Sequence, residues 1–183
     1  HALPVDHFFL AFEGAPLLKA APLFVLESLL GGEASVKWST GLSPLAQING
    51  AKAHAFNASL QDTGLFGIHV SAPSAKIAEA AKAAAQELTK VANGVSSEDI
   101  TKAVAKAKFV AAQNYEGSRV SSHESVAAGL LNGSETSLSA VLSHLDAVKA
   151  DDVASAAQAL LKSKPTSVAL GDVKQLPYAD ELL

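Results

Sequence analysis

Apolar and polar residues alternate in two short runs, residues 53–60 and 65–72, separated by a turn that ends in glycine. Side chains of a strand point to opposite faces in turn, so this alternation predicts two strands joined as a hairpin. We predict that helices cover the more apolar and bulky face of this hairpin. The residues on that face are Phe56, Ala58, Leu60, Phe66, Ile68 and Val70. The reverse face, small and partly polar, would stay open and carry Asn57, Ser59 and Gly67.

The remaining sequence predicts mostly helices. Apolar residues recur at helical spacing between residues 18 and 30, with Leu18, Ala21, Val25 and Leu29 expected to face inward. Further helices are predicted at residues 44–49, 74–93, 97–116, 122–131, 137–145 and 150–164. Two more strands are predicted at residues 7–13 and 167–170. The predicted fold is therefore α+β, an antiparallel or mixed sheet with helices packed on one face.

Two serines are candidate caps at helix starts. Ser43 precedes a proline, and Ser96 precedes an acidic first turn, the arrangement that satisfies the free N–H groups of a helix. We therefore expect both hydroxyls to accept hydrogen bonds from their own helices.

Composition excludes several classes of protein. The net charge is −4 with a single arginine, Arg119, which argues against a nucleic-acid binder. The most apolar stretch, residues 17–30, is interrupted by Lys19, Pro22 and Glu27, so no membrane span is predicted. Cysteine is absent, which removes disulfides and thiolate chemistry. Methionine is absent too, and we expect the sequence to be a fragment of a longer protein.

No catalytic, cofactor-binding or metal-binding residue is predicted. The six histidines are His1, His7, His54, His69, His123 and His144, and none shows the spacing of a zinc protease motif. His54 and His69 could pair across the hairpin, but aligning its apolar faces puts them on opposite sides of the sheet. Gly-x-Ser-x-Gly and the nucleotide-binding glycine motifs are absent. Arg119 is expected to form a structural salt bridge, with Glu116 or Glu124.

Residues 55–67, Ala-Phe-Asn-Ala-Ser-Leu-Gln-Asp-Thr-Gly-Leu-Phe-Gly, resemble the central hairpin of C-terminal domains in the pitrilysin-like (M16) family. The resemblance extends over essentially the whole chain, although Leu60 stands where an aromatic residue is usual. It implies the fold of the pitrilysin-like and processing-peptidase domains. The family includes zinc metallopeptidases, mitochondrial processing peptidase subunits and the core proteins of ubiquinol-cytochrome c reductase. Its zinc motif, His-x-x-Glu-His, belongs to the N-terminal domain and does not occur here.

The fuller Ala-Phe-Asn-Ala-Ser run and the ending at residues 177–182 favour the non-catalytic core branch of the family. Residues 1–183 would then be one C-terminal domain of a two-domain protein. The resemblance implies no cofactor and a peripheral position on the matrix side of the mitochondrial inner membrane. Its partners would be its own N-terminal domain, the other core protein and further subunits of the respiratory complex.

Two alternatives remain open from the sequence. The nearer is a C-terminal domain of a processing peptidase subunit or an active zinc metallopeptidase, in which the sheet contacts a peptide substrate. The more distant is an unrelated hydrolase with a dispersed Ser-His-Asp site.

Overall fold

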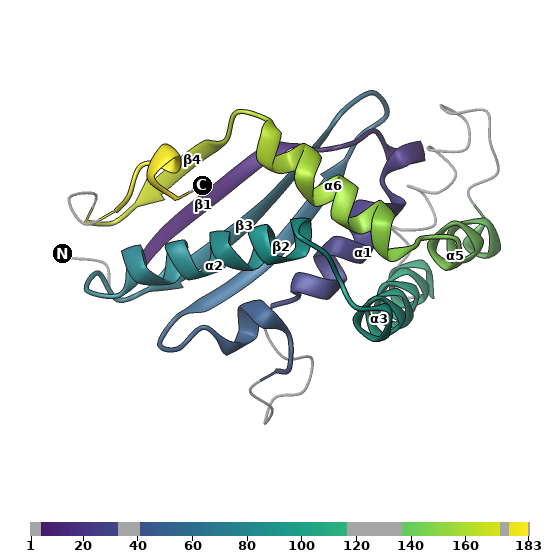
Figure 1. Cartoon of the computed structure of the whole chain (residues 1–183), viewed down its shortest axis with the longest axis horizontal. Helices are drawn as coiled ribbons and strands as arrows, with labels where there is room; N and C mark the ends of the chain where they lie inside the picture. Colours follow the sequence, from purple (N-terminus) through teal and green to yellow (C-terminus); the bar gives the residue numbers. More distant parts are fainter. Residues whose placement is uncertain (1–4, 33–40, 117–136, 173–175, 183) are drawn as a thin grey trace.

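The computed structural model describes residues 5–32, 41–116, 137–172 and 176–182. Its sheet consists of β1 (Asp6–Glu13), β2 (Lys52–Ser59), β3 (Gly64–Ala72) and β4 (Thr166–Leu170). Every neighbouring pair is antiparallel, and the strand order is β2-β3-β1-β4. The helices lie over one face of this sheet (Figure 1), which confirms the predicted α+β architecture.

The helices form two layers outside the sheet. They are α1 (Ala21–Leu30), α2 (Ile77–Ala92), α3 (Ser97–Glu116), α5 (Leu138–Asp146) and α6 (Ala150–Lys162). Three short 3₁₀ turns complete the described chain, at Leu17–Lys19, Pro44–Gln47 and Ala179–Glu181. Helices α1, α2 and α6 pack on the sheet, while α3 and α5 pack against α1 (Figure 1). The helix predicted at residues 122–131 lies outside the described residues.

The two candidate caps behave differently. The Ser96 hydroxyl accepts a hydrogen bond from the backbone N–H of Asp99 at 3.1 Å and donates to its carboxylate at 2.6 Å, as predicted for the start of α3. Ser43 occupies the N-cap position before Pro44 as predicted, but its hydroxyl accepts no hydrogen bond from the helix that follows. Its hydroxyl bonds both the N–H and the carbonyl of Gly32, each at 3.2 Å, and only a 3₁₀ turn follows. Ser43 therefore joins two loops.

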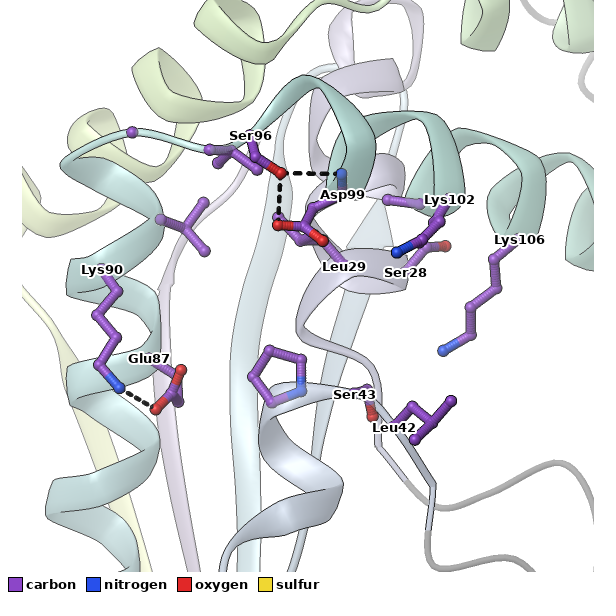
Figure 2. A pocket seen from close by; sticks show the side chains of 15 residues that line it. Ser28, Leu29, Leu42, Ser43, Glu87, Lys90, Ser96, Asp99, Lys102 and Lys106 are labelled. Atoms are coloured by element: carbon purple, nitrogen blue, oxygen red, sulfur yellow. Dashed lines mark hydrogen bonds and ion pairs between the residues drawn. The ribbon is translucent and has the colours of Figure 1, made fainter.

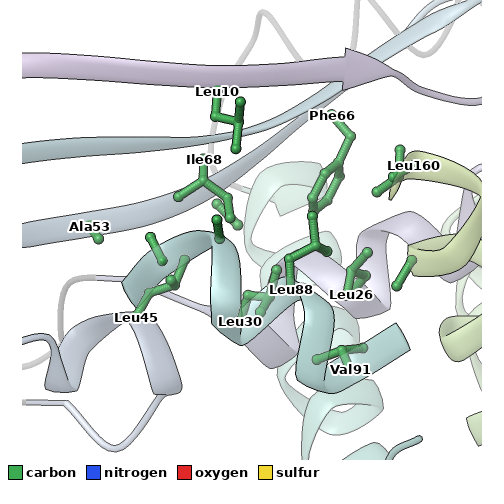
Figure 3. Close-up of a cluster of buried hydrophobic side chains, with 14 of the residues drawn as sticks. Leu10, Leu26, Leu30, Leu45, Ala53, Phe66, Ile68, Leu88, Val91 and Leu160 are labelled. Atoms are coloured by element: carbon green, nitrogen blue, oxygen red, sulfur yellow. The ribbon is translucent and has the colours of Figure 1, made fainter. Parts of the chain in front are cut away.

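The core lies between the sheet and the first helical layer (Figure 3). From the sheet it receives Phe8, Leu10, Phe12, Phe66, Ile68 and Val70, and from α2 the five residues predicted to face inward, Ile77, Ala81, Ala84, Leu88 and Val91. The predicted face of α1 was right for Val25, which is fully buried, and in part for Ala21 and Leu29, which pack half-buried against the core. It was wrong for Leu18, which is 70% exposed, and it missed the buried residues Leu23, Leu26 and Leu30. The 3₁₀ turn at Leu17–Lys19 has a shorter repeat, so Leu18 does not continue the stripe of α1.

The hairpin is present. The side of β3 that faces the helices was predicted correctly, but the side of β2 that faces them was predicted wrongly. Phe66, Ile68 and Val70 are buried under the helices as expected. Phe56, however, pairs with Gly67, and Asn57 pairs with Phe66, so Asn57 shares the helix-covered face and Phe56 does not. Residues directly opposite each other on paired strands point to the same side.

The turn of the hairpin fixes this register. Four residues separate the paired Ser59 and Gly64, so every even-numbered residue of β2 faces an odd-numbered residue of β3. Ala53 and Ala55 therefore turn toward α1, where their small side chains let the helix approach the strand closely. The size of the side chains on β2 therefore did not indicate which of its faces is buried.

Candidate functional site

The face of the sheet turned away from the helices, here called the open face, is not covered by any of the described helices. Its larger apolar side chains are Phe9, Phe56, Leu65, Val168 and Leu170. Its ionisable side chains are His7, Glu13, Lys52, His54 and His69. Val168 and Leu170 on the edge strand are 58% and 57% exposed. Gly67 lies on this face as predicted, but Asn57 and Ser59 do not.

Phe56 lies across the middle of the open face, over Gly67. A Cβ atom placed on Gly67 would come within 2.5 Å of Cζ of Phe56 and 2.6 Å of the carbonyl oxygen of Leu10. A glycine in a strand interior often marks such a close approach. The absent side chain lets the Phe56 ring lie close to the backbone of β3.

Three imidazoles gather on the same face of the sheet. His54 and His69 are direct cross-strand partners, which overturns the prediction that they fall on opposite sides of the sheet. Their rings meet edge to face with centroids 4.9 Å apart. Nδ1 of His7 lies 3.1 Å from Nε2 of His69, and the ring of Phe9 stacks on His69 at 4.2 Å between centroids.

Electrostatics favour the neutral form of the central imidazole. Partial burial, and after it the neighbouring His54 and His7, lower the pKa of His69 below its ordinary value. A neutral imidazole offers one nitrogen lone pair, and the short contact with His7 requires at least one of the two rings to be neutral.

On the other side of the sheet, a cavity of about 550 Å³ lies between β2 and helices α1, α3 and α5. Its walls are mostly apolar, but Glu27, Asn57 and Lys106 project into it. The Nδ2 atom of Asn57 is buried and has no hydrogen-bond partner among the described residues. Burial raises the pKa of Glu27 to about 7, and the ammonium of Lys106 opposes part of this rise.

The carboxyl of Glu27 should make stability depend on pH. Because its pKa is raised in the folded state, it favours folding when protonated, and that contribution is lost as the pH rises from about 4.5 to about 7. Glu27→Gln should differ less from the parent at pH 5 than at higher pH. At pH 8.5 it should be more stable by about 1–3 kcal/mol, allowing for partial exposure.

Urea unfolding at both pH values measures this difference. Glu98→Gln is the matched control, because Glu98 forms an exposed ion pair with Lys102 at 2.7 Å and should change stability little at either pH. An equal effect of Glu27→Gln at pH 5 and pH 8.5 would contradict the assignment.

A second hollow, of about 490 Å³, opens where α1 and α2 meet the start of α3 (Figure 2). Lys90 donates to Glu87 at 2.6 Å, and the Ser96 and Asp99 side chains bond each other at its rim. Lys102, which also lines it, is paired with Glu98. Because the ammonium groups of Lys90 and Lys102 are paired with carboxylates, little positive charge is left to bind an anion. We therefore do not assign an anion-binding site to this hollow.

The described residues show no three-ligand metal site. No group of three or more His, Cys, Asp and Glu among them is arranged to hold a metal ion. His144 lies exposed on α5, and His1, His123, Arg119 and Glu124 fall outside the described ranges. Within those ranges, no helix is both long and apolar enough to span a membrane. The prediction that the chain has no catalytic residue stays a prediction.

Comparison with known proteins decides the family. Residues 2–107 match the family model described as the peptidase M16 inactive domain. The chain belongs to the M16 family. The resemblance inferred from residues 55–67 is thereby confirmed, and the matching model describes an inactive domain.

The chain is similar to mitochondrial proteins of two kinds. Cytochrome b-c1 complex subunit 2 of Neurospora crassa is 39% identical over 94% of this chain, and that of Cryptococcus neoformans is 41% identical over 89%. The alpha subunit of the potato mitochondrial-processing peptidase is 32% identical over 96%. The chain spans about two fifths of the length of these relatives, 39%, 37% and 38% respectively.

A solved structure shows the same fold. A chain of the Candida albicans structure titled "Complex III2 from Candida albicans, Inz-5 bound" superposes with a TM-score of 0.87 at 20% sequence identity. The match covers 98% of this chain and 46% of that one.

The sequence analysis missed the histidine cluster. The signal that could have revealed it is the parity of the hairpin turn, since four intervening residues pair His54 with His69. The number of residues in the turn predicts which residues of β2 share a face with Phe66, and the large size of Phe56 does not.

Proposed function

We propose that this chain is the C-terminal domain of a cytochrome b-c1 complex subunit 2, also called core protein 2. In this role it is a non-catalytic subunit that supports assembly and stability of the mitochondrial ubiquinol-cytochrome c reductase. The observation that carries the proposal is the higher identity to two subunit 2 proteins, 39% and 41%, than to a processing peptidase subunit, 32%.

The architecture supports a binding role. One face of the sheet is sealed by helices, and the other presents apolar side chains to its surroundings without a three-ligand metal group. Its partners would be its own N-terminal domain, core protein 1 and other subunits of the complex. It would lie peripherally at the inner membrane on the matrix side.

A chimera tests this proposal directly. In an N. crassa strain lacking subunit 2, a chimeric subunit would carry this chain in place of the matching 39% of the native protein. We expect native gels to show assembled complex III and membranes to recover ubiquinol-cytochrome c reductase activity. A chimera that accumulates in mitochondria but restores no complex would contradict the proposal. The native subunit, expressed from the same promoter, is the control.

The second candidate is the C-terminal domain of a processing peptidase subunit, favoured by the relative from potato. It predicts that the parent protein, or its heterodimer, cleaves presequence peptides in a chelator-sensitive way. Under our proposal the purified chain cleaves none. An upstream His-x-x-Glu-His in the full-length gene would favour this candidate. The M16 assignment gives no support to an unrelated serine hydrolase, and an active-site serine probe should leave the chain unlabelled.

A further inference from the structure

The cavity between β2 and helices α1, α3 and α5 contains a hydrogen-bond donor that no described residue satisfies. The side-chain oxygen of Asn57 accepts a hydrogen bond from the Ser59 hydroxyl at 3.3 Å, so the amide nitrogen Nδ2 is the group left without a partner. A buried donor without an acceptor costs free energy, and an acceptor atom in the cavity would recover it. We propose that this cavity binds a small monocarboxylate with an apolar body, such as a medium-chain fatty acid, whose carboxylate accepts a hydrogen bond from Asn57.

The walls of the cavity suit the apolar body of such a ligand. Its volume of about 550 Å³ lies within the range of sites that enclose small molecules. Apolar side chains from three helices line it: Phe24 from α1, Ala107, Val110 and Ala111 from α3, and Val141 and Leu145 from α5. Burial of the ligand's hydrocarbon against these side chains would supply most of the binding free energy.

The charges around the unpaired amide favour an anionic head group. The ammonium of Lys106 lies at the wall of the cavity, where its Nζ atom would be 3.1 Å from a Cβ atom placed on Gly31. Glu27 is the acidic side chain among the described lining residues, and burial raises its pKa to about 7, so it is mostly protonated at pH 6. The other titratable side chains of the lining are His54 and Tyr115, and neither is a carboxylate. A bound carboxylate would therefore meet an amide donor, an ammonium and a neutral carboxyl.

Titration of the whole chain with octanoate at pH 6 tests the proposal. Calorimetry should show one octanoate bound per chain. The neutral comparison is 1-octanol, which has the same apolar body but no charge to pair with Lys106. It should bind about 10-fold more weakly, because hydrogen bonds to an ionised group are stronger than those between neutral groups.

Substitutions at the polar end of the cavity should change affinity in opposite directions. Asn57→Ala and Lys106→Gln should each weaken octanoate binding about 10-fold at pH 6. At pH 8.5, Glu27→Gln should bind octanoate about 10-fold more tightly than the parent, because it removes an ionised carboxylate beside the ligand. The matched controls are Asn49→Ala and Lys82→Gln, at exposed positions outside the lining, and both should bind like the parent. Far-UV circular dichroism verifies folding, and Asn57→Ser replaces the alanine variant if that variant unfolds.

The opposite effects of Lys106→Gln and Glu27→Gln distinguish a bound carboxylate from general uptake of apolar molecules. Three results would overturn the proposal. They are an absence of saturable octanoate binding, a 1-octanol affinity equal to that of octanoate, or an octanoate affinity that Asn57→Ala leaves unchanged.

Discussion

Phe66→Ala should lower the free energy of unfolding by about 3–5 kcal/mol, while Phe56→Ala should cost about 1 kcal/mol. Phe66 is 0% exposed in the core, under the helices, whereas Phe56 lies half-buried on the open face. Truncating a fully buried aromatic ring loses its transfer free energy and leaves a cavity. The ring on the open face has water on one side, so its loss costs less.

Urea unfolding followed by circular dichroism measures both values, with the midpoint compared at a common slope. The comparison tests the face assignment of the hairpin, because alternation of bulky residues would predict equal costs for the two phenylalanines. Equal losses, or a larger loss for Phe56→Ala, would refute the register. If Phe66→Ala fails to fold, Phe66→Leu should still cost about 1–2 kcal/mol.

Gly67→Ala should destabilise the fold by about 1–3 kcal/mol, although it adds a single methyl group. The new Cβ would lie 2.6 Å from the carbonyl oxygen of Leu10 and 2.5 Å from Cζ of Phe56. The ring can rotate away, but the carbonyl belongs to the β1 backbone and moves only with the strand. The loss of stability should therefore come mainly from weaker pairing between β1 and β3.

A double-mutant cycle separates the two contacts. Gly67→Ala should cost less in a Phe56→Ala background, because the clash with the ring has gone, but some loss should remain from the Leu10 carbonyl. Ser71→Ala, on the same face of β3, is the control and should change stability by no more than about 0.5 kcal/mol. A neutral Gly67→Ala would show that Phe56 and β1 do not approach β3 as described.

These experiments bear on function because the open face is where the proposed subunit meets its surroundings. Phe56 and the three histidines lie on β2, β3 and β1, and the exposed Val168 and Leu170 lie on the opposite edge strand, β4. A chimera that assembles poorly while its isolated chain stays folded would direct attention to these side chains.

Local sequence predicted which segments form helices and strands, because periodicity and turn residues act over a few positions. The alternation at residues 53–72 gave the hairpin, and the inward stripe of α2 was correct at all five positions. Family membership followed from the same hairpin, whose Asp-Thr-Gly-Leu-Phe-Gly turn resembles that of M16 domains.

Which side of β2 is buried was decided by tertiary structure. Alternation says that neighbouring residues face opposite ways, but not which set meets the helices; that choice depends on the turn parity and on how closely α1 approaches. Small alanines allow the approach, so they are buried and Phe56 is not. The cavity around Glu27 and the meeting of His7 with His69 likewise join residues far apart in sequence. The sequence by itself determined the helices, the strands and the family. Tertiary packing determined which side of β2 is buried and which distant side chains, such as His7 and His69, come into contact.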